Sequence, residues 1–145
     1  MERRNFLRLG LASTALALFE RPLFAAQKIA VVVHPKNPVK SLGLDEIEAI
    51  FKALRRSFTG GKRILPFNLP ARHPLRVAFD RAALHMEPDA VARYWIDQRV
   101  RGAQHPPTQV PSSKMMLQVV MSLETSIGYV PLGEVSGGVK VVAEV

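Results

Sequence analysis

Basic side chains gather around Pro74, at a position where the sequence predicts the start of a helix. Proline is favoured at the first helical position because its missing N–H would have no intrahelical partner there. The N–H groups of the next two residues are also expected to lack partners, and the helix dipole attracts anions to them. The residues predicted to contact a small oxyanion are Asn68, Arg72, His73, Leu75 and Arg76.

His73 has two expected roles at this position. Its side chain is placed to cap the helix and, when protonated, to contact an anion. The alternative is an ordinary helix terminus that water caps, with Arg72 and Arg76 scattered over the surface. Both interpretations stay open from sequence alone. With only one lobe to contact the ligand, we expect any binding to be weak, about millimolar.

Other residue types offer less chemistry. The four histidines lack the spacing of metal ligands and the chain has no cysteine, so neither a metal site nor a thiolate nucleophile is expected. Gly60-Gly61-Lys62 lacks the earlier glycine and the following hydroxyl residue of a phosphate-binding loop. Ser112 and Ser113 are expected to cap a helix. We therefore predict a protein that is not an enzyme and that uses no cofactor.

The elements that must position these residues follow from apolar periodicity. The predicted strands are 29–33, 63–68, 127–130 and 139–145. The predicted helices are 44–54, 74–84, 87–100 and 113–123. Residues 29–33 are continuously apolar, which indicates a strand buried on both faces, and Pro66 indicates an edge or an irregularity. Tyr94 and Trp95 are expected to pack in the core.

The order of these elements predicts an α/β fold, a single layered lobe with a central mixed sheet flanked by helices. Residues 27–145 are long enough for one domain with one core. The net charge of the chain is +8. The four arginines and two glutamates of residues 1–26 contribute +2, so residues 27–145 carry about +6. A basic surface favours anionic partners, but basic residues do not alternate with aromatic ones, so nucleic acid is not expected.

Residues 1–26 have the pattern of an export signal, with a basic start followed by about a dozen apolar residues. They resemble a twin-arginine signal, and the residues that fit it are Arg3, Arg4, Phe6 and Leu7. Glu2 and Arg8 depart from the usual pattern. The expected location is periplasmic, with general secretion as the alternative route. Without a cysteine no lipid anchor is expected, whereas an uncleaved leader would tether the domain to the membrane.

The order of several segments resembles the phosphate-type solute-binding proteins of bacterial ABC transporters, which have the type 2 periplasmic-binding fold. These segments are Val31–Val33, Asn37–Val39, Ile47–Phe51, Gly60–Ile64, Phe79 and Ile127–Val130. No single segment is specific, but together they span most of residues 29–130. The resemblance implies a periplasmic-binding-protein-like lobe and a transport function.

The departures from this family concern its ligand site. Its members have two lobes around the anion, whereas this chain is long enough for only one. The family's Ser-Gly-Thr at a helix N-terminus corresponds to His73-Pro74-Leu75, so the hydroxyl groups are missing. Asn68 or Leu69 stands where the family has an arginine. Part of the phosphate site is therefore absent.

Three functions remain open at this point. The first is a periplasmic solute-binding module for a small oxyanion such as phosphate. The second is a non-catalytic interaction module that has lost its ligand and docks a transporter or a second copy of itself. The third is a sensor domain that keeps residues 1–26 as a membrane tether.

Overall fold

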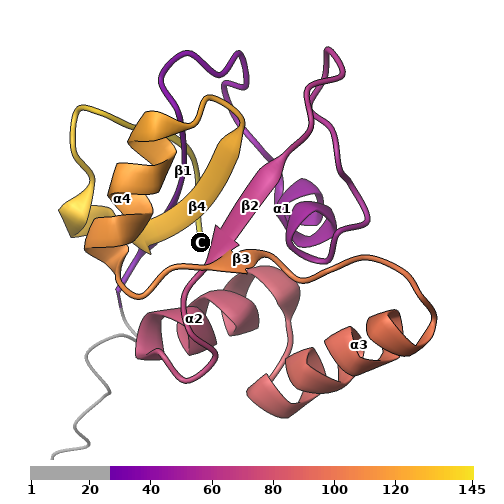
Figure 1. Ribbon diagram of the computed structural model, residues 1–145. Helices are drawn as coiled ribbons and strands as arrows, with labels where there is room; N and C mark the ends of the chain where they lie inside the picture. Colours follow the sequence, from indigo (N-terminus) through magenta and orange to yellow (C-terminus); the bar gives the residue numbers. More distant parts are fainter. Residues whose placement is uncertain (1–26) are drawn as a thin grey trace, which may run out of the picture.

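The computed structural model describes residues 27–145, so the predicted export residues Arg3, Arg4, Phe6 and Leu7 lie outside the described part. Five strands form one sheet in the order β3-β2-β4-β1-β5 (Figure 1). The strands are β1 (Ile29–Val33), β2 (Leu65–Asn68), β3 (Thr108–Gln109), β4 (Ser126–Pro131) and β5 (Lys140–Glu144). The helices are α1 (Leu44–Phe51), α2 (Pro74–Phe79), α3 (Pro88–Val100) and α4 (Ser113–Ser122).

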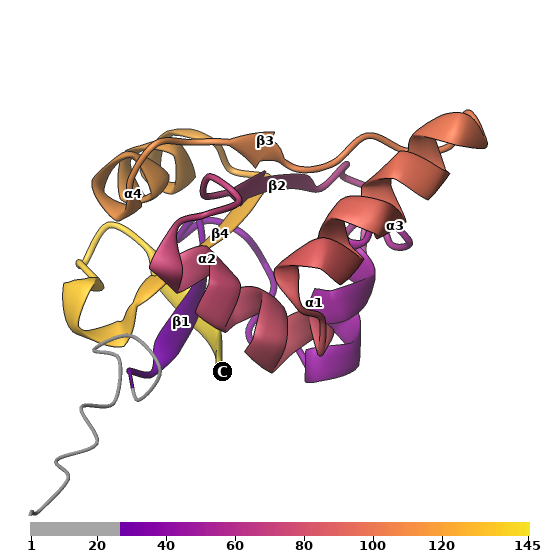
Figure 2. The ribbon, with the colours of Figure 1, turned by 90° about the horizontal axis from the view of Figure 1, so that it is seen from below.

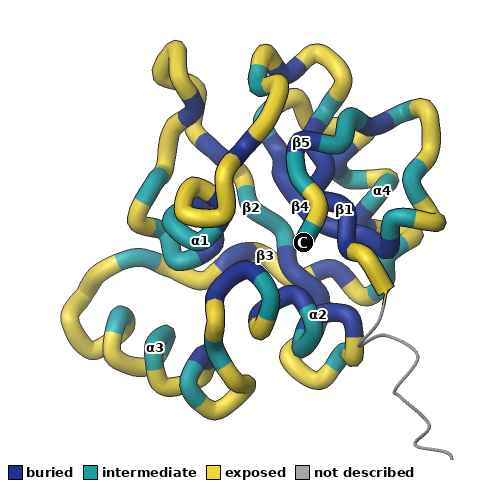
Figure 3. Tube along the Cα trace, turned by 180° about the vertical axis from the view of Figure 1, so that it is seen from behind, coloured by how far each residue is buried: buried dark blue, intermediate teal, exposed yellow. Residues whose placement is uncertain are grey.

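The sheet is mixed, as the sequence predicts. β1 runs antiparallel to β4 and β5, whereas β2 runs parallel to β4 and β3. All five residues of β1 are buried, because strands flank it on both sides and helices cover the sheet. Figure 3 shows β1 and β4 as the buried centre of the molecule.

Helices cover both faces of the sheet (Figure 2). The alternation of side chains along β4 shows which helix lies on which face. A Cβ atom at Gly128 would lie 2.4 Å from the Sδ atom of Met116, so glycine is what lets α4 approach this face closely. The next residue, Tyr129, points to the opposite face, where its ring contacts Phe79 of α2 and Phe51 of α1.

The helix expected over residues 74–84 changes its winding midway. α2 ends at Phe79 and continues as a π-helical turn, η1 (Asp80–Leu84). His85 then adopts a left-handed conformation with φ of 54°, which ends the helix. Phe79, the last residue of α2, and Asp80, the first of η1, are both buried in the interior.

Two sequence expectations need correction or refinement. The expected core stripe of helix 87–100 is wrong, because α3 buries only Val91 and projects from the body, with Val100 82% exposed. Tyr94 nevertheless joins α3 to the end of α1, since its hydroxyl donates to the Lys52 carbonyl at 2.7 Å.

The edge or irregularity that Pro66 indicates is refined by the strand pairing. At Pro66, β2 has a partner strand on one side only, because β3 pairs with the two residues that follow Pro66.

None of the helices in residues 27–145 combines the length and the apolar character that crossing a bilayer requires.

Candidate functional site

The predicted oxyanion site lies where β2 ends and α2 begins (Figure 1). β2 and β3 are parallel, so their carboxyl ends meet at this edge of the sheet. In open α/β sheets ligands bind outside the carboxyl ends of the strands. Asn68 ends β2, Arg72 and His73 lie in the loop that follows, and Leu75 and Arg76 lie in the first turn of α2.

His73 caps α2, as predicted. The Nδ1 atom of His73 accepts a hydrogen bond from the Leu75 N–H at 3.1 Å. The expectation that this N–H lacks a partner is therefore wrong. An Nδ1 that accepts must keep its lone pair, so capping and protonation of His73 exclude each other. In the capping state Nε2 carries the proton and is the atom that can donate to an anion.

Arg76 points into the protein and not towards solvent. Its Nη1 donates to the carbonyl oxygen of Leu69 at 3.0 Å, and its Nε lies 3.3 Å from Oδ2 of Asp80. Arg76 is 5% exposed and Asp80 is 3% exposed. The prediction that Arg76 surrounds the helix terminus as an anion ligand is therefore corrected: its guanidinium fixes the loop between β2 and α2 to the core.

Asn68 is also held by internal partners. Its Oδ1 accepts from the hydroxyl of Tyr129 and from the Leu69 N–H at 3.0 Å. Asn68 is 4% exposed and Tyr129 is fully buried, so the pair lies beneath the loop. Burial raises the pKa of Tyr129 well above its ordinary value, which keeps this hydroxyl protonated and able to donate.

Asp80 is the group of this network whose hydrogen bonding is incomplete. Among the described residues its Oδ1 has no hydrogen-bond partner. Burial raises the pKa of Asp80 to about 6, although the neighbouring Arg76 guanidinium acts in the opposite direction. The network therefore gains a positive charge when the pH falls through about 6, because Arg76 then loses its counterion.

Arg72 differs from the other predicted residues. It is exposed, and within residues 27–145 no carboxylate lies within ion-pair distance of it. The segment 65–79 contains no acidic residue at all. Arg72 and the outer nitrogen of His73 are thus two side-chain donors at this edge that the protein itself does not use.

The sequence interpretation missed Asp80 and Tyr129, which hold two of the predicted residues. Asp80 follows Arg76 by four positions, a spacing that places two helical side chains on one face. The pairing of Arg76 with Asp80 could therefore have been predicted from the sequence. Tyr129 lies 61 positions from Asn68 and only the strand pairing brings the two together.

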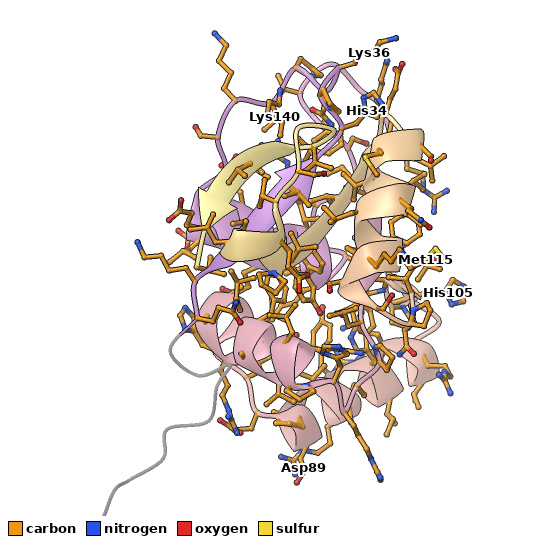
Figure 4. The ribbon with its side chains drawn as sticks, turned by 90° about the vertical axis from the view of Figure 1, so that its left-hand side faces the viewer. His34, Lys36, Asp89, His105, Met115 and Lys140 are labelled. Carbon is orange, nitrogen blue, oxygen red and sulfur yellow. The ribbon has the colours of Figure 1, made fainter. Side chains whose placement is uncertain are left out.

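No three His, Asp or Glu side chains within the described range are grouped to hold a metal ion. Figure 4 shows that His34 and His105 lie far apart, with His34 near Lys36 and Lys140 at one end of the molecule.

Comparison with solved structures gives the fold. The chain superposes on an ABC-type phosphate transport receptor from Vibrio cholerae with a TM-score of 0.64 and 19% identity, over 80% of this chain and 45% of the receptor. A protein from Clostridium perfringens described as a putative phosphate ABC transporter substrate-binding protein, solved with bound phosphate, has a TM-score of 0.65 and 20% identity, over 80% of this chain and 45% of that protein. PstS from Borrelia burgdorferi has a TM-score of 0.61 and 12% identity, over 81% of this chain and 47% of PstS. No protein-family model and no curated protein sequence matches the chain.

The predicted fold class, an α/β lobe like those of periplasmic-binding proteins, is confirmed by these likenesses. Residues 27–145 thus have the fold of one lobe of these proteins, and the chain spans less than half the length of the proteins that it matches. The neighbours are binding proteins and transport receptors by description.

Proposed function

We propose that this chain is a non-catalytic, solute-binding-type module that contacts a small oxyanion such as phosphate at the loop before α2. The carrying observation is the exposed Arg72 beside the helix-capping His73, at the carboxyl ends of two parallel strands, in a segment without acidic residues. Arg72 and the Nε2 proton of His73 are the ligand contacts. Asn68, Leu75 and Arg76 belong to the site as the groups that hold its loop in place.

The proposed binding is weak because few donors remain. The Leu75 N–H and the Arg76 guanidinium already have partners within the protein. One exposed arginine and one imidazole contribute a few charge-assisted hydrogen bonds, and a dissociation constant of about a millimolar is expected. This is the affinity of a module that releases its ligand readily.

The test is calorimetric titration of residues 27–145 with inorganic phosphate and sulfate at low salt. We expect millimolar binding that Arg72→Ala weakens about fivefold or more. Arg101→Ala is the matched control, because Arg101 is also exposed but lies after α3, and it should leave the affinity unchanged. Absence of heat at 10-fold higher phosphate than the expected dissociation constant, or equal affinity in both variants, would reject the oxyanion site.

A second candidate function is an interaction module that docks a protein partner. The observation in its favour is α3, which projects from the body and exposes the apolar side chains of Ile96 (56%) and Val100 (82%) one helical turn apart. Exposed apolar side chains of this kind are common at protein interfaces. The partner would be a transporter component or a second copy of the chain.

Cross-linking in cells that express the full chain distinguishes this candidate. A protein partner predicts an adduct that Ile96→Ser and Val100→Ser remove while phosphate binding is kept. A chain that stays monomeric and forms no adduct would reject the interaction module and leave oxyanion binding as the proposed function.

The proposed location of either function is the periplasm. The supporting features are the basic start and the apolar run of residues 1–26, with Arg3 and Arg4 followed by Phe6 and Leu7. Replacing both arginines by lysine is expected to retain the protein in the cytoplasm, as measured by cell fractionation. Unchanged export would favour the general secretory route.

A further inference from the structure

A second basic site lies away from the loop before α2. A cavity of about 220 Å³ opens between the end of α1, the strand β2 and the segment that leads from α3 to β3. We call it the arginine cavity. The residues that define its character are Arg56, Arg63, Phe67, Gln104, His105 and Pro106. The loop before α2 contributes no residue to it, so it is separate from the proposed oxyanion site.

The charge of the arginine cavity is positive and uncompensated. None of its lining residues is an aspartate or a glutamate. Arg55, which also lines it, is paired with Glu46 at 2.6 Å, but Arg56 and Arg63 have no carboxylate within ion-pair distance among residues 27–145. Two arginines without acidic neighbours favour an anion in the space between them.

A hydrogen bond joins Arg56 to the segment before β3, which also lines the cavity. Its Nη1 donates to Oε1 of Gln104 at 3.1 Å, which joins the end of α1 to the segment before β3. The carbonyl of Arg56 also accepts from the Ile64 N–H at 2.8 Å, so Arg56 and Arg63 come from facing arms of one hairpin. A guanidinium held by one neutral partner keeps further N–H groups for a ligand.

The carboxyl end of α1 lies beside the arginine cavity, but its partial negative charge does not prevent an anion from binding there. Helix C-termini carry partial negative charge on their free carbonyls. At α1 the carbonyls of Glu48, Ala49 and Ile50 accept N–H groups of the residues that follow the helix. The nearby arginines therefore determine the sign of the local potential.

The walls of the arginine cavity are largely apolar. Ile50, Phe67, Pro106 and Pro107 line it together with Leu65 and Pro66 of β2. A fully hydrated inorganic ion gains little from such walls, whereas a flat apolar group gains by leaving water. The volume lies below the roughly 300 Å³ at which pockets for drug-sized ligands begin, so the ligand must be small.

We propose that the arginine cavity binds a small organic anion, a carboxylate joined to a flat apolar body. The carboxylate lies between Arg56 and Arg63, and the apolar body lies against Phe67 and the two prolines. His105, an exposed residue that also lines the cavity, adds a hydrogen-bonding group. A planar guanidinium fits both parts, since it bonds carboxylates through two N–H groups and stacks on flat rings.

The test is an NMR titration of residues 27–145 with benzoate, with benzyl alcohol as the neutral probe of the same shape. We expect benzoate to shift the amide signals of Ala53, Arg63 and Thr108 with a dissociation constant of about a millimolar. Benzyl alcohol should bind at least about tenfold more weakly. The double variant Arg56→Gln with Arg63→Gln should lose at least about tenfold in benzoate affinity.

The matched control is Arg72→Gln, which removes an exposed arginine of the oxyanion site and should leave benzoate binding unchanged. The spectra of the variants report directly whether each one is folded. The proposal is overturned if benzoate shifts no signal at the cavity, if the double variant binds it equally well, or if benzyl alcohol binds as tightly. Phosphate binding that depends on Arg72 is measured separately, so the two proposals can fail independently.

Discussion

Replacing Arg76 by leucine is expected to lower the free energy of unfolding by about 3–5 kcal/mol at pH 7.5. The physical reason is that the substitution leaves the carboxylate of Asp80 buried without its counterion, and frees the Leu69 carbonyl that fixes the loop before α2. At pH 5 the cost should be smaller by about 1 kcal/mol or more, because Asp80 is then protonated in the folded state. Urea unfolding at both pH values measures the difference.

The sign of the pH effect follows from the raised pKa of Asp80. The folded state binds a proton up to about pH 6, whereas the unfolded carboxyl has its ordinary value of 3.8. The contribution of this group to stability therefore falls as the pH rises from about 4 to about 6, by an amount on the order of 3 kcal/mol. In Arg76→Leu the pKa of Asp80 should rise further, so this loss of stability extends to higher pH.

Two variants serve as controls for this prediction. Arg72→Leu removes an exposed arginine and should change stability by less than about 0.5 kcal/mol. Replacing both Arg76 and Asp80 by leucine removes the charge together with its partner and should recover much of the loss. A cost for Arg76→Leu that is equal at pH 5 and pH 7.5, or as small as that of Arg72→Leu, would contradict a buried ion pair.

Replacing Phe79 by alanine is expected to destabilise the protein by about 3–5 kcal/mol. Phe79 is fully buried; its ring stacks on Tyr129 with centroids 3.8 Å apart and meets the edge of Phe51 at 4.8 Å. The three rings join α1, α2 and β4, so the truncation opens a cavity where three elements meet. Thermal unfolding should show a midpoint lowered by roughly 10 °C or more.

The matched control for Phe79→Ala is Val100→Ala, because Val100 at the end of α3 is 82% exposed. This variant should unfold within about 0.5 kcal/mol of the original protein. Phe79→Leu should lie between the two, since leucine fills part of the cavity. A loss below about 1 kcal/mol for Phe79→Ala would show that the three rings do not join these elements energetically.

Both variants also bear on the proposed oxyanion site. Arg76 and Phe79 are both buried on α2, and Arg72 lies in the loop that Arg76 holds through the Leu69 carbonyl. A variant that loosens this loop while the protein stays folded should weaken phosphate binding although neither residue contacts the ligand. Stability and binding would then change together at this end of the sheet.

The sequence by itself determined the elements and the fold class. The continuous apolar run 29–33 required a strand buried on both faces, and the structure places it between β4 and β5 with every residue buried. Pro74 and His73 together determined where α2 begins, because a proline at the first turn and a capping side chain are local features. The resemblance of ordered segments to phosphate-type binding proteins gave the lobe architecture that the solved structures confirm.

Only the tertiary structure decided which of the basic residues are available to a ligand. A local pattern places Arg72 and Arg76 near the same helix terminus, but it does not contain the burial of each side chain. Arg76 turns inward because the Leu69 carbonyl and Asp80 offer partners inside, and Arg72 remains at the surface. The arginine cavity was hidden for the same reason, since Arg56 and His105 are 49 positions apart and meet only through the packing of α1, β2 and the segment before β3.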